Sequence, residues 1–256
     1  MVLNFCNERI LQYRVTCQSK DECISAIVGW LETDVHGKFF ICANPHSLVT
    51  ANVDPEFEKC FEQADLTTPD GIGIVYASKI LKGKINQRIT GSDIFHGLSK
   101  KLNIKAGEGY SYFFLGSTKE TLQRIKQNLA EDYPNVRYAG SYSPPYKVVF
   151  SDDDNREIIE AINAAKPDIL WVGMTAPKQD KWILKHKDKL NVKFIGAIGA
   201  VFDFYAGNIR RSHPFFQETG LEWLPRLLRE PKRLWRRNFI STPKFILKVI
   251  TQKFKI

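Results

Sequence analysis

The sequence has no long hydrophobic run. None of its apolar stretches approaches the roughly 20 residues that a helix needs to cross a bilayer. Its first ten residues (MVLNFCNERI) interleave polar and charged residues with apolar ones, so they lack the continuous apolar core of a secretion signal. We therefore expect a chain that neither spans a membrane nor is exported, and that acts in the cytoplasm.

Cysteine is scarce and unpaired. The five cysteines are odd in number and contain no closely spaced pair of the kind that binds zinc, which argues against a disulfide framework and a zinc site. Nothing in the sequence suggests an acidic metal-binding cluster either. We expect reduced thiols at Cys6, Cys17, Cys23, Cys42 and Cys60.

The composition is that of an ordinary globular protein, but the charge is unevenly distributed. The 256 residues are 43% hydrophobic and 25% charged, with a net charge of +9. Residues 210–256 hold twelve Lys and Arg against three Glu, so this segment carries the whole excess and residues 1–209 are neutral. We therefore predict two parts, an α/β domain over 1–209 and a basic amphipathic helical appendage over 210–256 that meets an anionic partner or surface.

Apolar strand-like runs alternate with helical patterns through the first part. Strands are predicted at 13–16, 38–43, 110–115, 135–139, 168–174 and 193–198, and a loop is expected over 140–147 (GSYSPPYK). This alternation predicts an α/β fold with a Rossmann-like, mainly parallel sheet covered by helices on both faces.

The stretch 64–78 (ADLTTPDGIGIVYAS) has the pattern of a ligand-binding turn. A short strand breaks at Pro69-Asp70-Gly71, and helical spacing resumes at Ile72. In open α/β sheets, ligands bind where a strand leads into a helix N-terminus. From this pattern alone Asp70 has two readings, a helix cap or a functional carboxylate. A second helix is expected from residue 91, capped by Ser92 or Asp93.

Three further motifs follow predicted strands, and an arginine-rich motif occupies the appendage. They are Ala43-Asn44-Pro45, the stretch 173–180 (GMTAPKQD), the stretch 196–203 (GAIGAVFD) and the stretch 220–237 (GLEWLPRLLREPKRLWRR). Together with the Pro-Asp-Gly turn, and in this order, they resemble the WecG/TagA/CpsF family of bacterial glycosyltransferases. The resemblance covers about residues 38–239.

This resemblance implies a metal-independent, inverting transfer of a hexose from a UDP-sugar to a saccharide linked to a polyprenyl diphosphate, in surface-polysaccharide synthesis. It implies no cofactor, and the sugar could be N-acetylmannosamine, its uronic acid, glucuronic acid or another hexose. The aspartate of the Pro-Asp-Gly turn is the family's proposed general base, which falls on Asp70. Inversion needs such a base to take the proton of the attacking hydroxyl.

The resemblance also implies roles for other residues. Gln179 corresponds to a polar active-site glutamine, with a surface position on a helix as the alternative, and Asp180 replaces a family glutamate, a change we expect to matter little. Asp203 would contact the nucleotide or cap a helix. The remaining substrate-binding candidates are Asn44, Gly71, Gly116, Gly173, Pro177, Lys178 and Gly199.

The appendage is predicted to have two roles. Arginine binds diphosphate in a bidentate manner and keeps its charge, so Arg226, Arg233 and Arg236 are expected to complete the active site. The aromatic residues and lysines of the appendage are expected to dock the protein on the inner, anionic face of the plasma membrane. Family precedent also allows subunit association.

Two positions depart from the family pattern. Cys42 stands where threonine is common, and a thiol is a weak hydrogen-bond donor, so we expect any role of that hydroxyl to be lost or to pass to Ser47 or Thr68. His46 stands where an acidic residue is frequent, and we leave it out of the predicted site.

Two other classes of function remain open from the residues themselves. The basic, aromatic-rich appendage could bind nucleic acid, although no base-reading module is recognisable. The glycines at 71 and 73 could belong to a dinucleotide-binding oxidoreductase, but the third glycine of that fingerprint is absent. We therefore favour the glycosyltransferase and expect no nucleic-acid partner.

Overall fold

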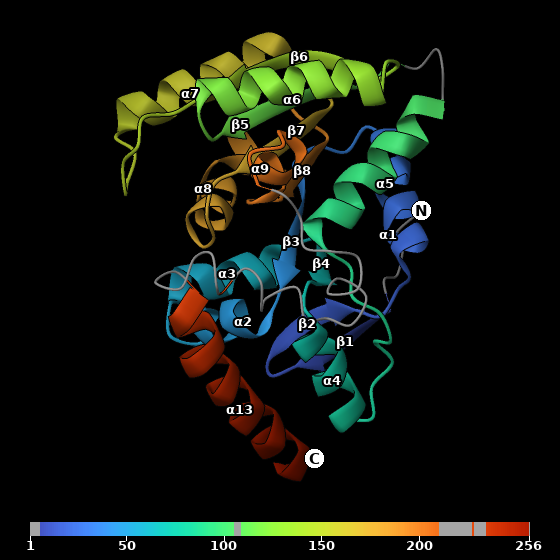
Figure 1. The fold of residues 1–256 in the computed structure, drawn as a ribbon, viewed down its shortest axis with the longest axis vertical. Coiled ribbons are helices and arrows are strands. Elements are labelled where there is room, and N and C mark those ends of the chain that lie inside the picture. The colour runs from blue at the N-terminus through green and yellow to red at the C-terminus, as the bar shows by residue number, and fades with distance from the viewer. Residues whose placement is uncertain (1–5, 105–108, 210–226, 228–233, 256) are drawn as a thin grey trace.

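A six-stranded parallel sheet forms the centre of the computed structural model, which describes residues 6–104, 109–209, 227 and 234–255 (Figure 1). The strand order is β4-β3-β8-β7-β5-β6, and every neighbouring pair is parallel. This confirms the predicted α/β fold class. The strands are β3 (Lys38–Ala43), β4 (Leu66–Pro69), β5 (Ser111–Gly116), β6 (Arg137–Tyr142), β7 (Ile169–Gly173) and β8 (Phe194–Ala197).

Helices cover both faces of the sheet because its central strands are apolar on both sides. Phe39 and Ile41 of β3 pack into one hydrophobic cluster, whereas Phe40, between them, packs into the other. The first cluster includes side chains from α2 (Pro45–Ala51), α3 (Pro55–Gln63), α4 (Ile72–Ile80), α7 (Asp152–Ala165) and α8 (Lys178–His186). The second includes side chains from α1 (Lys20–Leu31), α5 (Gly91–Ile104), α6 (Lys119–Asp132) and α9 (Val201–Tyr205).

The first predicted strand exists but lies outside the main sheet. It is β2 (Tyr13–Thr16), which pairs antiparallel with β1 (Asn7–Ile10) in a two-stranded hairpin. The sequence pattern did not predict β1, whose four residues include only one apolar side chain, Ile10.

Two local predictions were wrong. Residues 140–142 belong to β6 and not to a loop, because the backbone there pairs with β5, which supplies hydrogen bonds that the local sequence does not reveal. The cap of α5 is Thr90, and not Ser92 or Asp93. Thr90 Oγ1 accepts from the Asp93 amide at 3.1 Å, and Asp93 Oδ2 accepts from the Thr90 amide at 2.8 Å.

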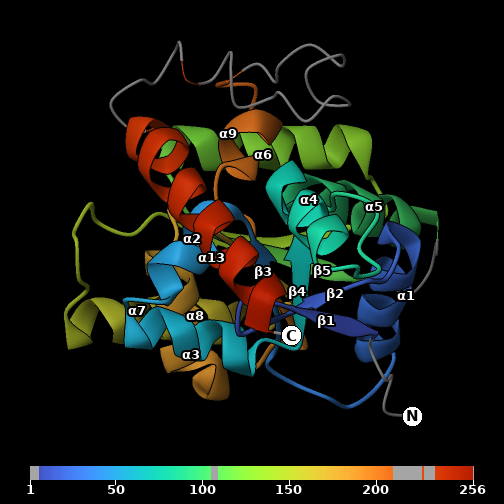
Figure 2. The ribbon, with the colours of Figure 1, turned by 90° about the horizontal axis from the view of Figure 1, so that it is seen from below.

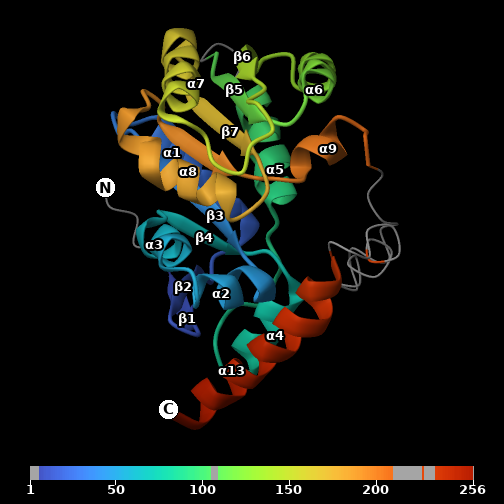
Figure 3. The ribbon, with the colours of Figure 1, turned by 90° about the vertical axis from the view of Figure 1, so that its left-hand side faces the viewer.

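The C-terminal segment packs against the α/β domain. A π-helical turn, η2 (Arg236–Ser241), leads into α13 (Thr242–Lys255), which contacts α2 and α4 (Figures 2 and 3). Phe245 and Val249 of α13, four residues apart on one helix face, are buried in the first cluster. In the part of the chain that the structure describes, no helix is both long and apolar enough to cross a membrane.

Candidate active site

The four central motifs meet because their strands are neighbours. Strands β4, β3, β8 and β7 are adjacent in the sheet, and their parallel direction places all four carboxyl ends on one edge. A cavity of about 650 Å³ opens there, within the size range of small-molecule sites. Its lining includes a residue at or just after the end of each of these strands, namely Asn44, Asp70, Gly173 and Gly199.

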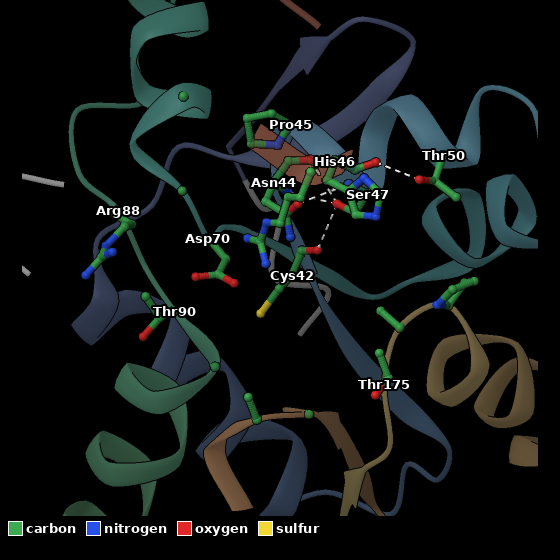
Figure 4. A pocket seen from close by; sticks show the side chains of 18 of the residues that line it. Cys42, Asn44, Pro45, His46, Ser47, Thr50, Asp70, Arg88, Thr90 and Thr175 are labelled. Carbon is green, nitrogen blue, oxygen red and sulfur yellow. Dashed lines mark hydrogen bonds between the residues drawn. The ribbon is translucent and has the colours of Figure 1, made fainter. Parts of the chain in front are cut away.

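Asp70 follows β4 directly and lines the cavity. Its amide donates to Ala43 O at 2.8 Å, which ties the end of β4 to the end of β3. The N-cap residue of α4 is Gly71, not Asp70, so the capping reading of Asp70 is wrong. Figure 4 shows the Asp70 carboxyl group in the space between Cys42, Arg88 and Thr90.

Backbone pairing brings Arg88 to the same place. The Ile89 amide donates to Pro69 O at 2.9 Å, so the segment before α5 runs beside the end of β4. Arg88 and Thr90, on either side of Ile89, both line the cavity (Figure 4). The sequence analysis missed Arg88, because an arginine in an irregular segment between two helices carries no local signal of this contact.

The first turns of α2 and α4 pack closely beside Asp70. A Cβ atom at Gly73 would lie 2.6 Å from Pro45 Cγ, so only glycine fits there without rearrangement. Asn44 caps α2, with Oδ1 accepting from the Ser47 amide at 3.0 Å, while Ser47 Oγ accepts from the Asn44 amide at 2.8 Å. The predicted substrate-binding residue Asn44 therefore also has a structural function, and the Ser47 hydroxyl is engaged in the same capping box.

Gln179 and Asp180 lie at the N-terminal end of α8 and line the cavity. Both side chains are almost completely buried, which excludes the surface-helix reading of Gln179. Gln179 Oε1 and Asp180 Oδ2 have no hydrogen-bond partner among the described residues. Burial raises the pKa of the Asp180 carboxyl group to about 7. Asp180 is thus a buried acid at the cavity, an environment that the sequence analysis did not anticipate.

Cys42 lies at the end of β3, close to two of these carboxyl groups. Desolvation, followed by the nearby Asp70 carboxyl group, raises the pKa of the Cys42 thiol well above its ordinary value, and Asp180 adds to this. Thr68 Oγ1 lies 3.9 Å from Cys42 Sγ and is fully buried. The thiol is therefore neutral, and the neighbouring Thr68 hydroxyl is directed to it.

The cavity brings together most, but not all, of the predicted site residues. Gly116 lies outside the lining, because β5 is separated from β3 by β7 and β8. Lys178 also lies outside: its ammonium group donates to Lys147 O and sits 3.8 Å from the centre of the Phe150 ring. The predicted residues that line the cavity are Asn44, Asp70, Gly71, Gly173, Pro177, Gln179, Gly199 and Asp203.

The predicted arginines of the appendage are placed differently. Arg226 and Arg233 lie outside the described residues. Arg236 is exposed and does not line the cavity, whereas its neighbour Arg237 does. The two residues differ in this way because consecutive residues of a helical turn project in different directions. His46, left out of the predicted site, also lines the cavity, and its Nδ1 lies 2.8 Å from Ser241 Oγ.

The acidic residues of the described chain do not assemble into a metal-binding group. No cluster of three or more His, Cys, Asp or Glu side chains with suitable geometry occurs among the described residues. The sequence does contain three adjacent aspartates, Asp152–Asp154, which begin α7. Asp154 belongs to a capping box with Ser151 and pairs with Lys147 at 2.7 Å, and none of the three lines the cavity.

Comparison with known proteins identifies the family of the chain. The sequence model of the family described as "Glycosyl transferase WecG/TagA/CpsF family" matches residues 8–256. The chain is 33% identical to an N-acetylglucosaminyldiphosphoundecaprenol N-acetyl-beta-D-mannosaminyltransferase of Bacillus spizizenii, over 90% of this chain and 87% of that relative. It is 29% identical to a protein of the same name from Staphylococcus aureus, over 85% of this chain and 82% of that relative. The chain belongs to the WecG/TagA/CpsF family of glycosyltransferases.

Proposed function

We propose that this protein transfers N-acetylmannosamine from a UDP-sugar to N-acetylglucosamine linked to undecaprenyl diphosphate, in the synthesis of a cell-surface polymer. The names of the two relatives support this sugar and this acceptor. The observation that carries the proposal is the position of Asp70, a carboxylate at the meeting point of four strand ends within the cavity.

In the proposed mechanism Asp70 is the general base. The acceptor hydroxyl attacks the anomeric carbon while its proton passes to the Asp70 carboxylate. The bond between that carbon and the UDP oxygen breaks on the opposite face, so the configuration inverts. Gln179, with an unpartnered buried amide oxygen, is suited to accept a hydrogen bond from a substrate hydroxyl or N–H group.

The leaving UDP acquires negative charge, and arginines are proposed to stabilise it. Arg88 and Arg237 line the cavity and are suited to a diphosphate. We keep Arg226 and Arg233 as candidates from the family resemblance. On this proposal the reaction needs no metal ion.

The C-terminal segment is proposed to hold the protein on a membrane surface. Trp235 and Phe239 are exposed and their ring centres lie 4.9 Å apart, while Ile250 and Phe254 of α13 are also exposed. Exposed lysines accompany them at positions 244, 248 and 253. Apolar side chains beside cations are typical of helices that lie on anionic membranes, so we propose peripheral attachment to the cytoplasmic face.

The test is a transfer assay with a panel of UDP-sugars. The protein is incubated with each donor and with N-acetylglucosamine linked to a short prenyl diphosphate, and the product is identified by mass spectrometry. We expect a disaccharide product from UDP-N-acetylmannosamine that the Asp70→Asn variant makes much more slowly. Transfer of a different sugar would correct the donor assignment, and no transfer from any donor would refute the proposal.

A further inference from the structure

The cavity has two chemically different halves. The polar half lies at the carboxyl ends of the strands, around Asp70. The other half lies between α4 and α13 and is almost wholly apolar. We call it the α4–α13 groove, lined by Tyr76, Ala77, Ile80, Phe245, Ile246 and Val249.

Each wall of the groove is one face of a helix. Ala77 and Ile80 lie three residues apart on α4, and Phe245 and Val249 lie four residues apart on α13, so each pair projects on the same side. The two helices are in contact, and Figure 3 shows α13 running beside α4. The groove is therefore formed by the packing of the C-terminal segment against α4.

The solvent-facing edges of the groove are also apolar. Tyr76 is 54% exposed and Ile246 is 46% exposed, although both line the cavity. Exposed apolar side chains that border a cavity lose contact with water when a nonpolar ligand binds. The groove thus favours a ligand without hydrogen-bonding groups, because a polar ligand would lose its bonds to water there without replacement.

We propose that the α4–α13 groove binds the first isoprene units of the acceptor's polyprenyl chain. This rests on the proposed function, in which a saccharide, a diphosphate and a polyprenyl chain are joined in that order. The cavity is continuous from Asp70 to Val249, so its polar half receives the saccharide while its apolar half receives the lipid.

Charge and surface pattern support this occupant. Arg237, in η2 just before α13, lines the same cavity and supplies a cation for the diphosphate between saccharide and lipid. Beyond the groove, α13 continues with the exposed apolar residues Ile250 and Phe254. A lipid leaving the groove along α13 thus meets further apolar surface, where a membrane would take the remainder of the chain.

The test compares two adjacent residues of α13 that differ in their relation to the groove. Ile246 lines it, whereas Leu247 is 65% exposed and lies outside the lining. Ile246→Asp introduces a charge into the groove, and Leu247→Asp introduces the same charge beside it. Tyr76→Asp introduces a charge into the opposite wall, on α4. A loss of binding in this variant could not be explained by a local disturbance of α13.

Calorimetry first measures binding of farnesyl diphosphate, below its micelle concentration and without detergent, with inorganic diphosphate as the head-group control. We expect wild type and Leu247→Asp to bind farnesyl diphosphate about tenfold or more tightly than diphosphate, from burial of the isoprene units. Ile246→Asp and Tyr76→Asp should lose this difference while still binding diphosphate. Equal affinity of wild type for the two ligands, or equal effects of the substitutions at 246 and 247, would overturn the proposal.

A transfer assay then separates this inference from the proposed function. Two acceptors are compared, N-acetylglucosamine diphosphate carrying a farnesyl group and the same compound carrying an ethyl group. We expect a lower KM for the farnesyl acceptor, and a KM for it that Ile246→Asp raises about tenfold. Equal KM values for the two acceptors would refute lipid binding in the α4–α13 groove but leave the proposed sugar transfer standing. Farnesyl-dependent binding without any sugar transfer would refute the proposed sugar transfer but leave lipid binding in the groove standing.

Discussion

His46 on α2 and Ser241 at the end of η2 are joined by a hydrogen bond of 2.8 Å between Nδ1 and Oγ. Their positions in the sequence differ by 195 residues, and both lie where the C-terminal segment meets the α/β domain. Leu11 and Arg9 of the hairpin make a second link, since their backbone groups bond the side chain of Gln252 on α13 at 2.7 and 3.0 Å. The C-terminal segment is thus fastened at both ends.

The His46 link should make docking of α13 weaker in acid. Burial, followed by the charges of Arg237 and Arg236, lowers the pKa of His46 in the folded protein. The unfolded chain therefore takes up a proton near pH 6.5 that the folded protein resists, so stability falls as the pH drops below that value. The protection factors of the amides in residues 242–255, which correct hydrogen exchange for the pH dependence of its intrinsic rate, should be lower at pH 5 than at pH 7.5, and His46→Asn should reduce the difference.

Ser241→Ala provides a matched measurement of the bond itself. It removes the hydroxyl and keeps the titrating imidazole, and the loss of one partly buried hydrogen bond costs about 1 kcal/mol of unfolding free energy. Urea unfolding measures this. An unchanged midpoint would mean that this bond does not fasten the segment.

Asp70→Asn should abolish most sugar transfer without loss of the fold. The amide cannot take the acceptor proton, and a general base contributes about 10²–10⁴-fold to a rate. Because Gly71 is the N-cap of α4, the melting temperature should change little. UDP binding by calorimetry is the control for an intact site. Turnover close to that of wild type would remove Asp70 from the mechanism.

Asp180→Asn should stabilise the protein at alkaline pH. The Asp180 carboxyl group has a pKa raised to about 7, so the folded state prefers it protonated. Wild-type stability therefore decreases as the pH rises from about 4 to 7, on the order of 1 kcal/mol per pH unit at most. The variant lacks this ionisation, so its thermal stability should exceed that of wild type at pH 8 and approach it at pH 4. A constant difference across this range would show that folding does not raise the pKa of Asp180.

Arg237 and the lysines of the C-terminal segment should have different functions, the first in turnover and the second in membrane binding. Arg237→Gln should reduce turnover on a soluble acceptor by about tenfold or more, because a charge-assisted hydrogen bond to the diphosphate is lost, and should largely retain vesicle binding. Substitution of Lys244, Lys248 and Lys253 by Gln should have the opposite effect, since each cation contributes about 1 kcal/mol at an anionic surface. Flotation with anionic vesicles and a soluble-acceptor assay measure the two properties. Point substitutions are preferable to removal of the segment, because truncation would also remove Phe245 and Val249 from the core.

Chelation tests the proposed independence from metal ions. Incubation with EDTA should leave turnover unchanged if arginines stabilise the leaving UDP. Loss of activity that Mg²⁺ or Mn²⁺ restores would contradict this and would direct attention to carboxylates at the cavity, including Asp203.

Much of the framework could be predicted from the sequence, because it depends on local patterns. The run at 38–43 is apolar on both sides of the chain, which is typical of a strand buried on both faces, and β3 has these bounds. The Pro-Asp-Gly turn likewise identified Asp70 at a strand end. Strand type, helix periodicity and turn chemistry are properties of neighbouring residues, so they can be read without the fold.

Which residues line the cavity depends on the tertiary structure. Gly116 and Gly173 both end a strand, yet only Gly173 lines the cavity. The reason is that β7, which ends at Gly173, lies nearer to β3 in the sheet than β5, which ends at Gly116. Strand order depends on pairing between distant segments, which no local pattern encodes. The burial of Asp180 and the choice of Arg237 over Arg236 have the same origin: each depends on which face of a helix packs inward, and only the assembled protein determines that.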